Sequence, residues 1–271
     1  MPKRRTALAL GAGLALLVVA TGLRSTVGDG RSGSSGGSAL TALSTAAGRV
    51  PHPEHPAFVV GRPVRLRKHE TRARFAPVTR AVTARSSPSP TAVPVADLAT
   101  ETPEGTTNIV LVLGEVTKPS GQQVHIRLPV LPNDRTAWVP RRALGGYGFV
   151  HTRLVVDRER FTATLFRDGR TVFRAAVGVG RAESPTPTGR FYIREELTGF
   201  GNPFYGPIAY GTSARSEVLT DWPGGGIVGV HGTNEPELIP GRISHGCIRL
   251  RNPDILRLSR LMPVGTPLTI R

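Results

Sequence analysis

The sequence predicts a mainly β protein with one helix near its C-terminal end. The chain of 271 residues contains 32 glycines and 24 prolines, about a fifth of the total, which strands and turns accommodate and long helices do not. Short apolar runs alternate along the chain with clusters of turn-forming residues. A helical pattern follows residues 252–254 (Asn-Pro-Asp), where Ile255, Leu256, Leu258 and Leu261 supply an apolar face.

The chain opens with basic residues followed by an apolar run. Residues 3–5 (Lys-Arg-Arg) precede apolar residues 7–20, which as a helix would reach about 21 Å, short of the roughly 30 Å hydrocarbon core of a membrane. We therefore expect residues 1–23 to form a signal peptide, or an uncleaved membrane anchor if the apolar run extends to Leu23. Either leaves the remainder exported, in the cell wall or at the outer face of the plasma membrane.

Residues 24–74 are predicted to be a flexible basic linker. Their first part is rich in Gly, Ser and Ala, and His52 and His55 stand among prolines, so we interpret both as linker residues rather than metal ligands. Residues 62–74 are arginine-rich and have no helical or strand periodicity. We interpret them as a solvated segment; the alternative is contact with an anionic wall polymer or a membrane surface.

The charge of the whole chain also favours an anionic partner. The formal net charge is +16, carried almost wholly by arginine. The sequence has no RNA-binding motif with interleaved aromatics, no zinc-finger spacing and no basic helix. Nucleic acid is therefore not an expected partner.

Residues 75–145 are predicted to form a small β module. Its expected strands are residues 78–82, 108–115, 123–128 and 136–140, separated by Pro, Gly and Asn-Asp turns. Such spacing favours a small antiparallel barrel or sandwich, and the Trp-Val-Pro step resembles SH3-like modules. His125 alternates with apolar neighbours and is interpreted as a strand residue.

Residues 149–271 are predicted to be a second β domain. The expected strands are residues 154–156, 161–166, 171–179, 190–193 and 267–270, with a hairpin turn at residues 168–169. Residues 199–212 are glycine-rich and aromatic, which is typical of a mobile loop over a site.

The candidate site lies in residues 226–250. Apolar residues 227–230 lead to His231, and Ile248 and Leu250 follow Cys247, the only cysteine of the chain. Two short strands would bring the imidazole and the thiol to one end of a sheet, where the histidine activates the thiol as a nucleophile.

The lone cysteine of an exported chain has other interpretations. A buried, inert thiol is one. Zinc ligation by His231, His245 and Cys247, in a metal-dependent hydrolase or binding protein, is another.

Two motifs resemble those of a known family. His231-Gly232, followed by residues 244–250 (SHGCIRL), is similar to the signature of the L,D-transpeptidase catalytic domain, and residues 186–189 (TPTG) match a turn found upstream in that family. The resemblance covers residues 149–271, and the preceding module resembles the accessory module of actinobacterial members. It implies a β-sandwich or barrel with one helix.

The resemblance also implies a reaction. Cys247 would attack the third residue of a tetrapeptide stem, D-alanine would leave, and a second stem amine would resolve the thioacyl-enzyme into a 3→3 peptidoglycan cross-link. A carboxypeptidase or endopeptidase would share the acyl-enzyme and resolve it with water. No cofactor or metal is implied, and we expect a monomer that acts on peptidoglycan stem peptides.

The site residues expected from this resemblance fall into three groups. The catalytic group has Cys247 as nucleophile and His231 as acid–base, with His245 and Ser244 shaping the loop. Backbone amides of His245, Gly246 and Cys247 would hold the oxyanion. The expected substrate-binding residues are Arg249, which would bind a stem carboxylate, Gly232, whose carbonyl would orient the histidine, and Tyr205 and Tyr210.

Overall fold

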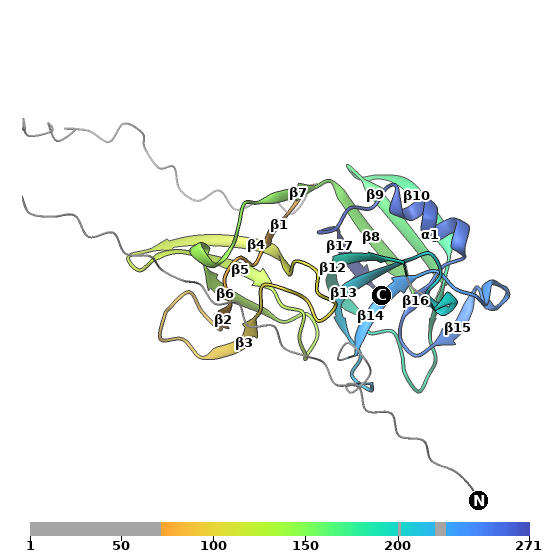
Figure 1. Cartoon of the computed structure of the whole chain (residues 1–271), viewed down its shortest axis with the longest axis horizontal. Coiled ribbons are helices and arrows are strands. Elements are labelled where there is room, and N and C mark those ends of the chain that lie inside the picture. The colour runs from red at the N-terminus through yellow and green to blue at the C-terminus, as the bar shows by residue number, and fades with distance from the viewer. Residues whose placement is uncertain (1–71, 200–201, 220–225) are drawn as a thin grey trace, which may run out of the picture. The chain divides into compact units, whose positions relative to one another are not determined.

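The structure is a computed structural model that describes residues 72–199, 202–219 and 226–271 (Figure 1). These residues form two β-sheets, three 3₁₀ turns and one α-helix, as the sequence predicts for a mainly β chain. The signal or anchor at residues 1–23 and nearly all of the linker at 24–74 lie outside the described residues. Among the described residues no helix has the length and apolar character needed to cross a membrane.

The first sheet has seven strands in the order β3-β2-β6-β5-β4-β1-β7. In chain order they are β1 Ala73–Pro77, β2 Val82–Arg85, β3 Pro94–Leu98, β4 Ile109–Lys118, β5 Gly121–Arg127, β6 Thr136–Pro140 and β7 Gly148–Val150, with η1 Arg141–Ala143 between the last two. All of their pairings are antiparallel. The predicted strand at residues 78–82 is wrong, because the chain turns there between β1 and β2.

The second sheet has ten strands in the order β10-β9-β8-β17-β12-β13-β14-β16-β11-β15. The strands are β8 Thr152–Asp157, β9 Thr162–Arg167, β10 Arg170–Ala176, β11 Gly178–Gly180, β12 Gly189–Thr198, β13 Ile208–Arg215, β14 Ile227–His231, β15 Gly241–Ser244, β16 Ile248–Arg249 and β17 Pro267–Ile270. The other elements are η2 Pro203–Tyr205, η3 Pro236–Leu238 and α1 Asn252–Ser259. Asp168 and Gly169 make the predicted hairpin turn with φ of 50° and 79°.

Period-two alternation places the core of the ten-stranded sheet. Leu154 and Val156 of β8 and Leu165 of β9 are fully buried, as are Ile255 and Leu258 on the inner face of α1. Burial of each such side chain contributes about 1.5–3 kcal/mol. The helix therefore covers the sheet with Ile255 and Leu258 of the predicted apolar face, whereas Leu256 is exposed and Leu261 lies beyond the helix and is partly buried.

The two sheets belong to one compact unit, Val64–Arg271, and bond to each other directly. The buried Tyr192 of β12 donates its hydroxyl to the carbonyl of Ile109 over 3.0 Å, and its ring packs against Ile109 and Leu111 of β4. Glu195 accepts the hydroxyl of Thr102 over 2.7 Å. Strands β4 and β12 are thus joined by both apolar and polar contacts.

The expected loop at residues 199–212 is shorter than predicted. Strand β13 begins at Ile208 and pairs with β12 and β14, and η2 lies just before it. Gly211, one of the glycines that suggested a loop, serves close packing instead, because a Cβ there would lie 2.4 Å from Glu195 Oε1.

Candidate active site

Cys247 lies in a tight turn between β15 and β16. Ser244 donates its hydroxyl to the Cys247 carbonyl over 2.6 Å and accepts the Gly246 amide over 3.1 Å. Gly246 has φ of +120°, a conformation that L side chains rarely adopt. Ser244 therefore shapes the loop, as expected, and holds the residue that carries the thiol.

Thr186 ties this turn to a neighbouring segment of the chain. Its hydroxyl donates to the Gly246 carbonyl over 2.7 Å and accepts the Gly180 amide over 2.8 Å, and the side chain is fully buried. The Thr186 carbonyl in turn accepts Arg158 Nη1. The turn at residues 186–189 is thus a bracket for the cysteine loop.

His231 is the last residue of β14, which runs parallel to β16. Val230 pairs with Ile248 and His231 with Arg249, so the imidazole lies beside the residues that follow Cys247. His231 Nδ1 is 2.6 Å from the Gly232 carbonyl. Because a carbonyl only accepts, Nδ1 carries the proton. The opposite nitrogen, Nε2, is buried and has no hydrogen-bond partner among the described residues.

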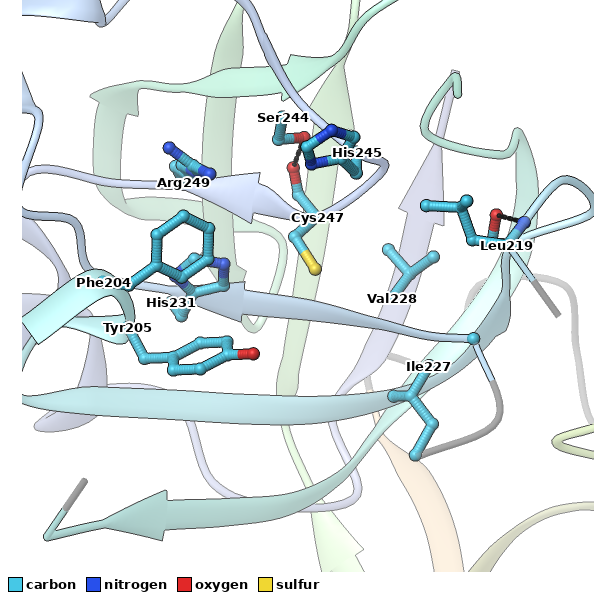
Figure 2. Close-up of a pocket in the computed structure, with 12 residues that line it drawn as sticks. Phe204, Tyr205, Leu219, Ile227, Val228, His231, Ser244, His245, Cys247 and Arg249 are labelled. Carbon is cyan, nitrogen blue, oxygen red and sulfur yellow. Dashed lines mark hydrogen bonds between the residues drawn. The ribbon is translucent and has the colours of Figure 1, made fainter. Parts of the chain in front are cut away.

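The thiol and the imidazole converge over a glycine of β14. A Cβ built on Gly229 would lie 3.7 Å from His231 Cδ2 and 3.8 Å from Cys247 Sγ, so both side chains border the same small space. The Gly229 amide donates to Sγ over 3.3 Å. Figure 2 shows the sulfur and the imidazole in one pocket.

Burial keeps both groups neutral at rest. The pKa of His231 is lowered to about 4, chiefly by burial and to a smaller extent by the positive charge of Arg249, against the opposing effect of the hydrogen bond to Gly232. Burial raises the pKa of the Cys247 thiol, against the opposing effects of the Gly229 amide and Arg249. These shifts favour a thiol beside a neutral imidazole, whose Nε2 can take the proton as the sulfur attacks.

The pocket around this pair is narrow, with a volume of about 40 Å³. Its walls come from η2, β14, β15 and β16 and the segments next to these elements (Figure 2). The lining residues are Phe204, Tyr205, Ser216, Leu219, Gly226, Ile227, Val228, His231, Ser244, His245, Cys247 and Arg249. A space of this size holds a few water molecules.

Two aromatic residues of η2 cover the histidine. The ring centroids of Tyr205 and His231 are 5.1 Å apart, and those of Phe204 and His231 are 5.9 Å apart. Asn202 caps the turn by accepting the Phe204 amide over 3.0 Å. These rings pack near the imidazole and contribute to its burial.

Arg249 is already engaged by other side chains. Nη1 forms an ion pair with Glu235 at 2.8 Å, and the guanidinium lies 4.2 Å from the centre of the Phe204 ring. The side chain is almost fully buried. A stem carboxylate that binds Nη1 of Arg249 would compete with Glu235, whereas Nε of Arg249 has no hydrogen-bond partner among the described residues.

Most of the predicted site residues come together, but not all. The Gly232 carbonyl holds the histidine, yet Gly232 does not line the pocket. The Gly246 amide donates to Ser244, so it can reach an oxyanion only by giving up that bond. Tyr210 requires correction: it is fully buried in the core of the ten-stranded sheet, with its hydroxyl 3.5 Å from the Met262 carbonyl, because strand alternation turns it inward.

Other residues of the site were not predicted from the sequence. They are the Thr186 hydroxyl, Glu235 beside Arg249, and the wall residues Phe204, Ser216 and Val228. The TPTG turn was a usable signal for the first, but the others are separated from Cys247 in sequence and carry no motif. Within the described residues, no three His, Cys, Asp or Glu side chains are arranged so that they could hold a metal ion. His231, His245 and Cys247 therefore do not form such a group in this structure.

The part of the chain that contains Cys247 and His231 is similar to known proteins. Residues 151–270 match the family model of the L,D-transpeptidase catalytic domain. YkuD of Bacillus subtilis (strain 168), which is named as an L,D-transpeptidase, is 36% identical over 109 residues, covering 40% of this chain and 59% of that protein. YbiS of Escherichia coli (strain K12), also named as an L,D-transpeptidase, is 52% identical over 134 residues, covering 43% of this chain and 44% of that protein.

One solved structure gives a longer but weaker match. An L,D-transpeptidase from Mycobacterium tuberculosis H37Rv is 17% identical with a TM-score of 0.38, covering 72% of this chain and 98% of that one. The match covers 59% of the length of YkuD and 44% of the length of YbiS.

Proposed function

Because residues 151–270 belong to the L,D-transpeptidase catalytic-domain family, we propose that the chain forms 3→3 cross-links in peptidoglycan with Cys247 as nucleophile. The observation that carries this proposal is that Cys247 Sγ and the His231 imidazole border the same space at Gly229, with Nδ1 held by a carbonyl and Nε2 without a hydrogen-bond partner among the described residues. A fixed base beside a thiol is what acyl transfer needs.

The first half-reaction acylates the enzyme. Sγ attacks the carbonyl carbon of the third residue of a tetrapeptide stem while His231 Nε2 takes the thiol proton. The bond to the terminal D-alanine breaks, and Nε2 returns the proton to the leaving amine. The neutral resting pair fits this order, since the proton moves only when the carbonyl is in place.

The second half-reaction transfers the acyl group. A side-chain amine of another stem attacks the thioester carbon, its proton passes to Nε2, and Sγ leaves and recovers a proton from the imidazole. The Cys247 amide lies next to the reacting carbonyl and is the natural oxyanion donor. Water in place of the amine would give the carboxypeptidase or endopeptidase reaction.

The remaining parts of the proposal concern location and partners. The basic and apolar residues at positions 3–20 support export, to the cell wall or the outer face of the plasma membrane. The charge of +16 supports contact with an anionic wall polymer or membrane surface. We propose a monomer that acts on stem peptides there.

Product analysis separates the two acyl-transfer outcomes. The full chain is incubated with a tetrapeptide-stem donor whose own side-chain amine is blocked, with and without a stem that offers a free side-chain amine. We expect a cross-linked product that appears only with the acceptor and is absent for Cys247→Ala. Hydrolysed donor alone, at any acceptor concentration, would refute the transpeptidase proposal and leave the hydrolase.

A further inference from the structure

The seven-stranded sheet carries a groove on the face opposite its core. Neighbouring strands place Arg85 opposite Trp138 and Trp138 opposite His125. Their chain neighbours Ala84, Ala137 and Val139 point into the core, so this cross-strand row lies on the outer face.

Trp138 offers one face of its indole to the groove. His125 stacks on the other side, with ring centroids 4.6 Å apart and an interplanar angle of 15°. The groove is lined by Trp138, by Arg85 of β2 and by Gln123 of β5, but not by His125, so the stacked imidazole does not fill it. The imidazole thus fixes the indole as a rigid platform.

The groove is far larger than the pocket at Cys247. Its volume is about 520 Å³, in the range of small-ligand sites. A second hollow of about 430 Å³ shares Ser87, Ser89 and Ser120 with it and extends it between the β2–β3 and β4–β5 hairpin loops. A continuous groove of this kind suits a chain-like ligand.

The charged residues of the groove are all basic. Arg85 and Arg142 line the first hollow and Lys118 lines the second. In residues 72–199, 202–219 and 226–271 none of the three forms an ion pair. Asp97 accepts the hydroxyl of Thr83 but does not line the groove. The potential in the groove therefore favours an anionic ligand.

From these features we propose that the groove binds an acidic glycan strand. The indole face suits the apolar C–H face of a sugar ring, hydroxyls of Ser87, Ser89 and Ser120 with the Gln123 amide match sugar hydroxyls, and the basic residues match carboxylates along the chain. A peptide would make fewer contacts than a glycan with the flat indole face and with the serine hydroxyls. The site is separate from Cys247 and does not depend on the proposed reaction.

Binding to defined probes tests this proposal in the full chain. The acidic probe is peptidoglycan glycan strands freed of stem peptides, whose lactyl carboxylates are exposed. A chitin oligosaccharide of equal length is the neutral probe, and polyglutamate of equal charge is the non-sugar polyanion. We expect the acidic glycan to bind more tightly than either, as measured by titration calorimetry near physiological ionic strength.

Variants locate the binding in the groove. Trp138→Ala should weaken binding of the acidic glycan about tenfold or more, as loss of a central aromatic anchor does. Arg142→Gln, at an exposed position, should weaken it several-fold and reduce its salt dependence, while the matched Arg135→Gln, at an exposed position outside the groove, should bind as the wild type does. All variants keep the arginine-rich residues 62–74, so the contribution of that segment to polyanion binding is the same in each.

The proposal fails on several outcomes. Absence of binding by the wild type, equal binding of polyglutamate or of the neutral chitin probe, or wild-type affinity in Arg142→Gln would each overturn it. Thermal melting shows whether Trp138→Ala is folded, and Arg142→Gln decides the matter if it is not. Acylation of Cys247 should be unchanged in both variants, so failure here is distinct from failure of the proposed reaction.

Discussion

Replacement of Thr186 by valine removes the bracket that holds the cysteine loop. Valine keeps the shape of threonine but has no hydroxyl, so the buried Gly180 amide and Gly246 carbonyl each lose a partner at 2.8 and 2.7 Å. An unsatisfied buried group costs about 1–3 kcal/mol, and we take about 2–4 kcal/mol for the two together. For a domain of this size that is a fall in Tm of roughly 4–16 °C.

Two measurements follow from this change. Thermal or urea unfolding reports the stability, and the rate of covalent adduct formation at Cys247 reports the placement of the loop. Thr186→Ser is the matched control, since it keeps the hydroxyl and should retain most of both. If Thr186→Val unfolds within about 0.5 kcal/mol of the wild type, the size of an ordinary surface substitution, and acylates at the same rate, the bracket is refuted.

Three further predictions concern the histidine and the contact between the sheets. The free energy of unfolding should fall by roughly 3 kcal/mol between pH 6.5 and pH 4, because the unfolded chain binds a proton at His231 that the folded chain, with a pKa of about 4, does not; this part of the pH dependence should vanish in His231→Gln, and its persistence there would assign it elsewhere. Gly232→Ala would place a Cβ 2.4 Å from Asn252 Oδ1 and shift the carbonyl that holds the imidazole. Formation of the covalent adduct at Cys247 should therefore slow about tenfold or more. An unchanged rate would show that the Gly232 carbonyl does not position His231. Tyr192→Phe leaves the Ile109 carbonyl without its hydroxyl partner, so urea unfolding should show a loss of about 1–3 kcal/mol with the acylation rate unaltered; equal stability would mean that this bond does not join the sheets.

The convergence of Cys247 and His231 could be predicted from the sequence. Apolar residues 227–230 and the pair Ile248 and Leu250 each indicated a strand, and strands that follow one another in the chain often lie side by side. The structure adds that β14 and β16 are direct parallel neighbours, which period-two patterns do not specify. Pairing order depends on long-range contacts.

The protonation state of the pair could not be predicted in the same way. A histidine near a cysteine suggests an ion pair, but the outcome depends on how much water reaches each group. Phe204 and Tyr205 bury the imidazole from a segment that the sequence marks as a loop. Burial is a property of the folded pocket, and no local motif encodes it.

Tyr210 shows why loop and strand were confused. The glycines around it are typical of a mobile loop, but Gly211 is required because the Glu195 carboxylate occupies the space of a Cβ. Strand β13 crosses the centre of the sheet, where Tyr210 faces the core. Glycine occurs both where two segments pack closely and where the chain turns, and only tertiary contacts distinguish the two cases.

Intact-mass analysis of the protein after incubation with a carbapenem or a tetrapeptide-stem donor tests the central claim, that the Cys247 sulfur is acylated with His231 as its base. We expect one covalent adduct per chain, none in Cys247→Ala, and formation slowed by about 10²–10⁴ in His231→Ala with the fold intact. An adduct that persists in Cys247→Ala, or an undiminished rate in His231→Ala, would contradict it.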